Sequence, residues 1–158
     1  MKLIITEKPS AGQAYAKVLG VRERHDGYLE GGGYIVSWCI GHLVELSEPE
    51  EYNIRYSKWE YADLPIIPDD WKYRVSSGTQ KQFEILKKLM ARKDVTGVIN
   101  CCDAGREGEL IFRLVYHLRF TAPSGRSKTE SRPLGAVKRS CPSPGKQNTE
   151  NYCCSMWL

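Results

Sequence analysis

Several features are missing from this sequence of 158 residues. It contains no run of 18 apolar residues, which excludes a membrane-spanning helix. The first six residues lack the basic start and long apolar run of a signal peptide, so we expect a cytoplasmic protein. There is no CxxC pair, which argues against a zinc site. There is also no GxGxxG or Walker-type loop, which argues against a nucleotide-binding domain.

The excess of positive charge is small and lies in one part of the chain. Lysine and arginine together number 23 and aspartate and glutamate 19, a net charge of +4. Residues 121–158 hold six of these cations and two of the acids, so residues 1–120 are neutral overall. The charge of the whole chain is therefore no argument for binding nucleic acid.

The six cysteines are interpreted as reduced thiols. Cys39, Cys101 and Cys102 lie in apolar runs, and Cys153 and Cys154 lie near the end of the chain. Because a disulfide framework is typical of small secreted proteins, and no signal peptide is recognised, we expect no such framework here.

The chain divides into a patterned body and an unpatterned tail. Apolar residues make up 41% of the sequence and charged residues 27%, which is typical of a folded domain. Residues 121–158 contain four of the eight prolines, six serines and no apolar periodicity. We therefore expect one domain over residues 1–120 and a disordered tail over residues 121–158.

The body begins with a predicted β–α unit. Residues 2–6 are typical of a short buried strand, Pro9 opens a helix, and Gly20 ends it. The apolar stripe expected to face the core consists of Ala11, Ala14, Tyr15, Val18 and Leu19.

The middle of the chain predicts a hairpin and a long connection. Residues 28–40 indicate a β-hairpin with glycines 31–33 at its turn. The alternative is that these glycines form a phosphate-binding loop. Such a loop lies between a strand and a helix, and that order is not predicted here. Residues 47–75 indicate a partly ordered surface connection. Its aromatic residues either fix the loop to the core, which we favour, or stack on nucleic-acid bases. They are Trp59, Tyr61, Trp71 and Tyr73.

Two helices and a strand complete the body. A helix is predicted from Ser77 to Met90, where Ser77 and Gln80 form a capping-box pattern. The β-branched run 95–102 predicts a strand buried on both faces of a parallel sheet. A last helix is predicted from Gly105 to about Phe120. The fold class is therefore α/β, with a mainly parallel sheet flanked by helices.

Charged residues follow two of the predicted strands. Glu7 and Lys8 follow the first, and Asp103 follows the later one, with Glu107 and Glu109 in the first turn of the next helix. Sites in open parallel sheets form at the carboxyl ends of strands. If these strands are neighbours, the acids at 7, 103 and 107 converge, and clustered carboxylates favour a hard cation such as Mg²⁺.

Each acid also has an ordinary structural interpretation. An acid in the first turn of a helix complements the helix dipole, and we favour this interpretation for Glu109. The alternative for Glu7 is an ordinary acidic residue in a loop. The segment 103–109, however, holds four charges and two glycines between a buried strand and a buried helix. The glycines are expected to let the backbone approach a ligand closely.

Three motifs resemble one enzyme family. Residues 4–10, Ile-Ile-Thr-Glu-Lys-Pro-Ser, resemble the start of type IA DNA topoisomerases, especially bacterial topoisomerase III. Residues 40–43, Ile-Gly-His-Leu, and residues 103–110, Asp-Ala-Gly-Arg-Glu-Gly-Glu-Leu, resemble two further motifs of that family, in the same order. The resemblance covers about residues 1–120 and implies a Toprim domain, a Rossmann-like α/β module.

The resemblance implies a role for individual residues. Glu7 would handle the proton on the 3′ oxygen as DNA is cleaved and rejoined, and Lys8 would stabilise the phosphate. Glu7, Asp103 and Glu107 would hold Mg²⁺. Lys8, His42 and Arg106 would contact DNA, although a purely structural histidine is the alternative for His42. The implied setting is the nucleoid of a bacterial cytoplasm.

Two departures from the family limit what is expected of this chain. Gly105 replaces the second aspartate of the Asp-x-Asp signature, which removes one metal ligand. The downstream domain with the nucleophilic tyrosine has no counterpart, and Tyr152 lies in the unpatterned tail, whose composition suggests a shifted reading frame or an unrelated end. We therefore expect that the chain alone does not relax supercoiled DNA.

Other functions fit the same residues. One alternative is a stand-alone Toprim nuclease that uses a metal ion and water in place of tyrosine. Another is a non-enzymatic remnant that binds metal or DNA, or that is a partner of the missing domains or of another topoisomerase chain.

Overall fold

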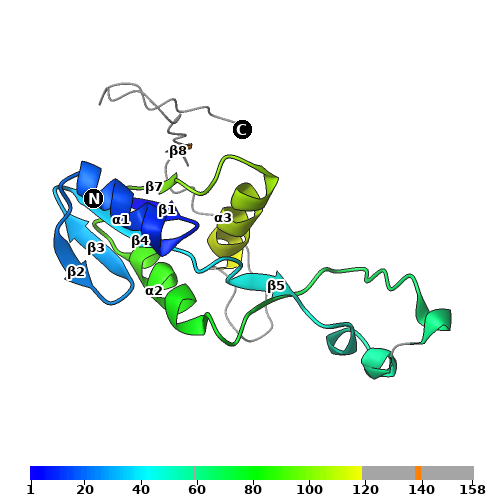
Figure 1. The fold of residues 1–158 in the computed structure, drawn as a ribbon. Helices are drawn as coiled ribbons and strands as arrows, with labels where there is room; N and C mark the ends of the chain where they lie inside the picture. Colours follow the sequence, from blue (N-terminus) through cyan, green and yellow to red (C-terminus); the bar gives the residue numbers. More distant parts are fainter. Residues whose placement is uncertain (59, 119–137, 140–158) are drawn as a thin grey trace.

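The computed structural model describes residues 1–58, 60–118 and 138–139. Its centre is a six-stranded sheet in the order β2-β3-β4-β1-β7-β8, with helices on both faces (Figure 1). The strands of this sheet are β1 Lys2–Thr6, β2 Glu23–His25, β3 Tyr28–Gly31, β4 Tyr34–Trp38, β7 Gly97–Asn100 and β8 Lys138–Arg139. The helices are α1 Pro9–Val18, α2 Gln80–Ala91 and α3 Arg106–Leu118.

The predicted neighbouring strands are confirmed. β1 pairs in parallel with both β4 and β7, with Ile5 opposite Asn100 and Thr6 opposite Trp38. The carboxyl ends of these three strands therefore lie at one edge of the sheet. β2, β3 and β4 form an antiparallel extension, so the α/β fold with a mostly parallel centre is also confirmed.

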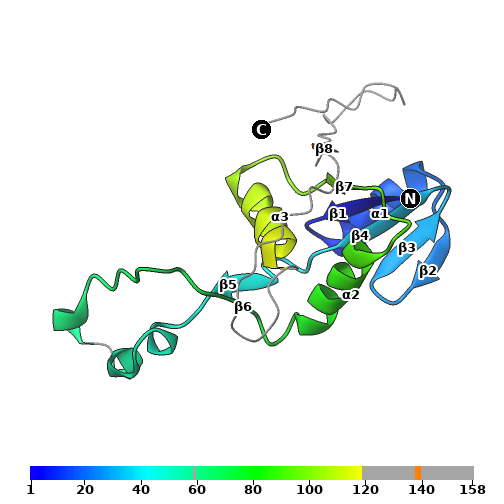
Figure 2. The ribbon, with the colours of Figure 1, turned by 180° about the vertical axis from the view of Figure 1, so that it is seen from behind.

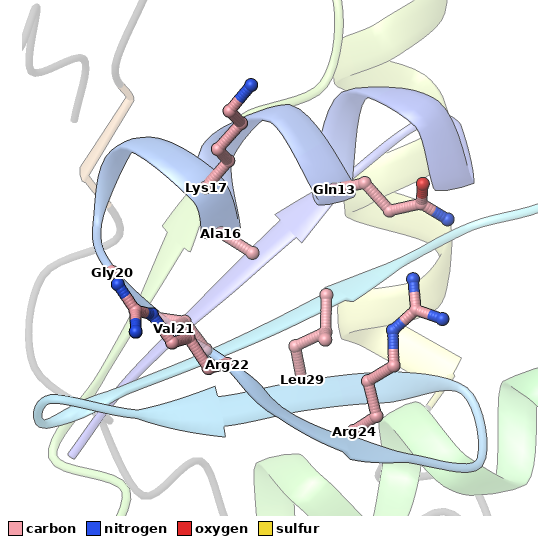
Figure 3. A pocket seen from close by; sticks show the side chains of 8 residues that line it. All are labelled: Gln13, Ala16, Lys17, Gly20, Val21, Arg22, Arg24 and Leu29. Carbon is pink, nitrogen blue, oxygen red and sulfur yellow. The ribbon is translucent and has the colours of Figure 1, made fainter.

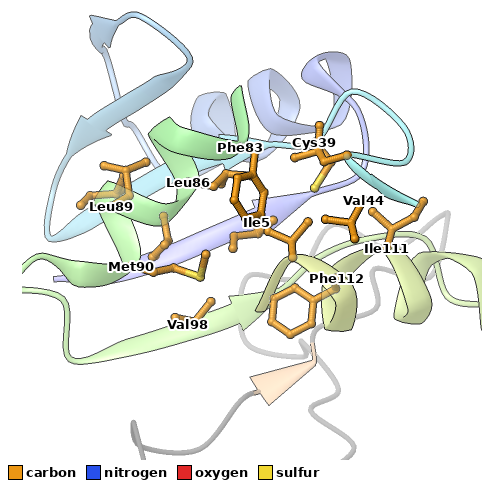
Figure 4. Close-up of a cluster of buried hydrophobic side chains, with 14 of the residues drawn as sticks. Ile5, Cys39, Val44, Phe83, Leu86, Leu89, Met90, Val98, Ile111 and Phe112 are labelled. Atoms are coloured by element: carbon orange, nitrogen blue, oxygen red, sulfur yellow. The ribbon is translucent and has the colours of Figure 1, made fainter. Parts of the chain in front are cut away.

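Alternate residues of β1 face two apolar clusters. Leu3 and Ile5 pack among the side chains of α2, α3 and β7, which Figure 4 shows gathered on one face of the sheet. Ile4 faces the other side, where it packs with Ala16 of α1 and Leu29 of β3. Residues 3–6 are all buried, which explains why the strand reads as a continuous apolar run.

The buried face of α1 differs from the predicted stripe. Gly12 and Ala16 are its buried residues, whereas Ala14 and Val18 are exposed. A Cβ on Gly12 would lie 2.8 Å from Cε3 of Trp38, so α1 packs too closely on β4 for a larger residue at this position. The helix therefore packs on the sheet through Gly12 and Ala16, while Tyr15 and Leu19 of the predicted stripe are partly buried against the same cluster.

The start of α2 also differs from the prediction. The helix begins at Gln80 rather than Ser77, and no side chain caps it. The Thr79 hydroxyl instead donates to the carbonyl oxygens of Leu43 and Ser76. The predicted apolar stripe of α2 is confirmed, since Phe83, Leu86, Leu89 and Met90 are buried.

The glycine turn has the expected form. β3 and β4 are antiparallel and are joined by Gly32 and Gly33, whose φ angles are 57° and 84°. Two successive positive φ angles suit a tight hairpin and favour glycine at both positions. The phosphate-cradle alternative has no support in this arrangement, and β2, which extends the hairpin to a third strand, was not predicted.

An arm extends from the body between two short strands. β5 Val44–Leu46 and β6 Tyr73–Val75 pair antiparallel, and residues 47–72 between them project away from the sheet (Figures 1 and 2). The arm contains three 3₁₀ helices, Pro49–Glu51, Ile54–Ser57 and Tyr61–Asp63.

The prediction that aromatic residues fix this segment to the core is wrong. Tyr61 is 92% exposed, and Trp71 and Tyr73 are also exposed; Trp59 lies outside the described residues. Residues 47–72 contain seven acids and three basic residues, a net negative charge that disfavours stacking on nucleic acid. The described aromatic side chains of this segment are therefore exposed to solvent and are neither packed on the core nor suited to binding nucleic acid.

Most of the predicted tail lies outside the described residues. Within it, only β8 is described, and it pairs in parallel with β7 at the end of the sheet. The expected disorder of residues 121–158, their suggested origin in another frame, and Tyr152 are therefore not tested. Among the described residues, no helix has the length and apolar character needed to cross a membrane.

Candidate metal and phosphate site

Glu7 and Lys8 occupy the turn between β1 and α1. The buried Thr6 hydroxyl donates to the Lys8 carbonyl oxygen at 3.0 Å, and the Gly12 amide donates to the same oxygen at 3.1 Å. These bonds hold the two-residue turn at the end of β1. The Glu7 side chain is 12% exposed, whereas the Lys8 side chain extends into solvent.

Asn100 holds the second turn, which follows β7. Its side-chain oxygen accepts from the Cys102 amide at 3.0 Å, and its side-chain nitrogen donates to Glu109 Oε2 at 3.1 Å. Glu109 also accepts from Arg113 Nε at 2.7 Å. The buried amide thus connects β7, the turn and α3, and it places Asp103 at the sheet edge.

Gly108 lets α3 pack against this turn. A Cβ on Gly108 would lie 2.2 Å from the Asp103 carbonyl oxygen, a contact that no side chain can make. Around Gly105, in contrast, a Cβ would meet nothing within 4 Å. The close approach expected at these glycines is therefore between helix and turn at Gly108, rather than between backbone and ligand.

Lys8 lies between two carboxylates from different strands. Its Nζ is 3.5 Å from Glu7 Oε1 and 3.4 Å from Asp103 Oδ2. The negative charge of Glu7, followed by that of Asp103, raises the pKa of Lys8 above its ordinary value. Of the three acids that the sequence predicts to converge, the structure therefore brings Glu7 and Asp103 to one place, with Lys8 between them.

Glu107 makes a separate pair. Its Oε1 lies 3.3 Å from His42 Nε2; the Glu107 side chain is largely exposed and that of His42 is partly exposed. Arg106 is exposed at the first residue of α3, beside this pair. Within the residues that the structure describes, no group of three or more histidine, cysteine, aspartate or glutamate side chains is placed to hold a metal ion. Glu107 is thus not gathered with Glu7 and Asp103.

Two thiols lie next to the acidic turn. Cys102 directly precedes Asp103, and its hydrogen bond with Cys39 and its burial raise its pKa. The charges of Glu7 and Asp103 act in the same direction. Both cysteines are free thiols, as expected from the sequence, and a thiol held in its protonated form is a poor metal ligand.

The donor set fits a hard divalent cation. The candidate ligands are carboxylates, and Mg²⁺ is ordinarily held by one or two protein carboxylates, with water and phosphate oxygens completing its coordination. Glu7 and Asp103, which share the Lys8 ammonium, supply that number. Two carboxylates suffice for Mg²⁺, so the absence of a three-ligand cluster does not conflict with this fit.

Sequence reasoning missed two positioning residues. Asn100 lies within the predicted strand 95–102 without a role of its own, and Glu109 is predicted to complement the helix dipole. The signal for Asn100 was a polar amide at the end of a buried strand, where an unbonded amide is costly. Glu109 does lie in the first turn of α3, but its contacts with Asn100 and Arg113 show a more specific role.

Comparison with known proteins agrees with this geometry. The sequence matches the Toprim domain over residues 2–129. The chain belongs to the Toprim family. The Toprim match covers β1, β4, β7 and α3, and therefore both turns that carry the candidate residues.

Several curated relatives of this Toprim chain are bacterial enzymes named DNA topoisomerase 3. That of Bacillus thuringiensis (strain Al Hakam) is 43% identical over 137 residues, which cover 86% of this chain and 19% of the relative. That of Staphylococcus epidermidis (strain ATCC 12228 / FDA PCI 1200) is 49% identical over 113 residues, which cover 72% of this chain and 16% of the relative. The chain spans about a fifth of the length of the curated relatives it matches.

Proposed function

We propose that this Toprim chain supplies the acidic, phosphate-handling segment of a type IA DNA topoisomerase. The observation that carries the proposal is the position of the Lys8 ammonium between the carboxylates of Glu7 and Asp103. This places a positive charge and two acids at one sheet edge, where a phosphodiester could be both bound and protonated. The named relatives are DNA topoisomerases, which agrees with DNA as the substrate.

Glu7 and Lys8 are the proposed catalytic residues. The Lys8 ammonium would stabilise negative charge on the reacting phosphate, because a fixed positive charge lowers the energy of the transition state. The Glu7 carboxyl group is the proton carrier for the 3′ oxygen during cleavage and rejoining. Its low exposure and its turn, held by Thr6 and Gly12, keep it in a constant position.

Asp103, Glu7 and Glu107 are the proposed ligands of Mg²⁺. When bound, the ion supplies charge stabilisation to phosphate oxygens. Glu107 would have to give up its contact with His42 to take part. His42 and Arg106 lie beside Glu107 and, with Lys8, are the proposed contacts to the DNA backbone.

Titration with MgCl₂ alone tests the metal assignment. We expect calorimetry to detect one weak site in the purified chain, and Asp103→Asn to weaken it at least about tenfold, because one of the proposed carboxylate ligands is lost. Glu50→Gln removes an exposed acid on the arm and is the matched control. Equal affinity of Asp103→Asn and Glu50→Gln would contradict the assignment.

A DNA assay separates the proposed function from its rivals. With Mg²⁺ and supercoiled plasmid, we expect the purified chain to bind DNA without relaxing or nicking it, because the residues that the structure describes include no candidate tyrosine nucleophile at this edge. ATP-independent relaxation would refute this expectation. Nicking that disappears in Glu7→Ala would instead establish the nuclease alternative.

A further inference from the structure

A second charged site lies on the opposite face of the sheet from α2 and α3. A pocket of about 320 Å³ opens between α1 and the strands β2 and β3. Three cationic side chains line it: Lys17 from α1, Arg22 before β2, and Arg24 within β2. In Figure 3, the Arg24 guanidinium and the Gln13 amide lie on the same side of the pocket, Arg22 lies near Gly20 on the other side, and the Lys17 amine extends from the rim into solvent.

These three cations have no acidic partner in the described part of the chain. All three side chains are exposed, and none of the ion pairs among the described residues involves them. In contrast, Arg92 is held by Glu30 and Asp94, and Arg74 by three glutamates. In a region that is neutral overall, three cations without acidic partners around one hollow are a local excess of positive charge.

The floor of the pocket offers little apolar surface. Ala16, Val21 and Leu29 form it, and they are only 2%, 4% and 6% exposed because they pack into the apolar cluster beneath. A ligand would therefore gain little by burying a hydrophobic group there. The chemistry that the pocket offers is positive charge, together with the side-chain amide of Gln13.

We propose that this groove, defined by Gln13, Lys17, Arg22 and Arg24, binds phosphates of the DNA backbone. The proposal rests on the proposed function, because it takes DNA as the substrate and adds a second contact. Several cations along one groove suit a polyanion with regularly spaced charges better than a single small anion. No lining residue is aromatic, so the site contacts phosphates rather than stacking on bases.

The groove is separate from the acidic edge. α1 begins at Pro9, next to Glu7 and Lys8, whereas Lys17 and Gly20 lie at its other end. DNA held at both places would run along α1, with its backbone guided by cations at one end and handled by the acidic edge at the other. Loss of the groove should therefore weaken DNA binding without affecting Mg²⁺ binding.

Charge-removing variants test the proposal. We compare Lys17→Gln/Arg22→Gln/Arg24→Gln with a control that removes three exposed cations elsewhere, Lys81→Gln/Lys88→Gln/Lys93→Gln. Binding of a fluorescent 20-nucleotide single strand and of the matching duplex is measured by anisotropy between 50 and 200 mM salt. Because the groove side chains are exposed, thermal unfolding should be unchanged in both variants.

We expect the groove variant to bind DNA about tenfold more weakly at low salt. For the loss of three phosphate contacts, its salt slope should be reduced by about two with the single strand and by about three with the duplex. Its response to MgCl₂ should match that of the unaltered chain. Equal DNA binding by the two triple variants would overturn the groove proposal while leaving the acidic site intact. Displacement of the DNA by polyglutamate at equal charge would also overturn it, since it would indicate a site for acidic peptides.

Discussion

At the scale of single residues, two glycines of one motif have opposite surroundings. Gly108 lies against the backbone of Asp103, where a Cβ would be 2.2 Å from the carbonyl oxygen, whereas Gly105 faces open space. Both positions look alike in the sequence. The first is needed for the packing of α3 on the acidic turn, whereas a side chain at the second would meet no neighbouring atom.

The two glycines predict opposite results for the same substitution. Gly108→Ala should lower the free energy of unfolding by about 1–3 kcal/mol, because the added methyl group forces α3 or the turn to move. Gly105→Ala should change it by less than about 1 kcal/mol. The free energies of unfolding of both variants are measured by chemical denaturation. Equal stability of the two would mean that α3 does not pack on Asp103 as described.

At the scale of elements, an ion pair connects the antiparallel extension of the sheet to the end of α2. Arg92 donates to both oxygens of Glu30 in β3, at 2.7 and 2.9 Å. These hydrogen bonds lower the pKa of Glu30 below its ordinary value. A carboxyl group with a lowered pKa stabilises the fold while it is ionised, and this contribution is lost as the pH falls through its folded-state pKa.

The pair predicts a defined pH dependence. Glu30→Gln should cost about 1 kcal/mol at neutral pH, where Glu30 is ionised in the folded and the unfolded chain. The difference from the unaltered protein should begin to shrink below about pH 4.3, the ordinary carboxyl pKa, and should vanish once folded Glu30 is protonated.

Unfolding free energies measured between pH 3 and pH 7 test this, with Glu50→Gln as a control that removes an exposed acid. A Glu30→Gln difference that is constant over this range would show that the ionised carboxylate is not what stabilises the fold.

Much of the fold follows from patterns within single elements. The parallel neighbours β1 and β7, the glycine hairpin and the buried face of α2 agree with the sequence, because each depends on a short apolar run or a turn residue. The inward face of α1 and the start of α2 do not. They depend on the contact of Trp38 with Gly12 and on the bond from the Thr79 hydroxyl to the Leu43 carbonyl oxygen, which are tertiary contacts.

For the candidate site, the sequence likewise predicts which strand ends carry the acids but not the contacts between their side chains. The acids at two strand ends could be placed at one edge because parallel neighbours share that edge. The position of Lys8 between Glu7 and Asp103, and the pairing of Glu107 with His42, depend on side-chain geometry beyond the strand ends. Asn100 was missed because its role appears only once the turn and α3 are both in place.

At the scale of the whole molecule, the arm of residues 47–72 stands apart from the sheet. Its exposed apolar side chains are Ile54, Tyr61, Leu64, Ile67 and Trp71. Its base is closed by the β5–β6 pair, by the bond from the Lys72 amide to the Tyr52 hydroxyl, and by Arg74 among Glu45, Glu48 and Glu51. The part of the arm beyond this base, residues 53–71, is called the tip, and it adds exposed apolar surface.

Removal of the tip is expected to leave the body folded. Replacing residues 53–71 by a short Gly-Ser linker should shift the melting temperature by only a few degrees and should reduce dye binding and self-association, because exposed apolar area is lost. Light scattering and thermal unfolding make the measurements. Loss of cooperative unfolding would show instead that the tip supports the body.

The central claim is that the turns after β1 and β7 form one cation and phosphate site. Titration of the ¹⁵N-labelled chain with Mn²⁺, a paramagnetic substitute for Mg²⁺, tests it most directly. The claim predicts that the amide signals of Glu7, Lys8, Asp103 and Ala104 broaden together at low Mn²⁺ and that Asp103→Asn abolishes the effect at both turns. Broadening at one turn alone, or equally over the exposed acids of the arm, would contradict it.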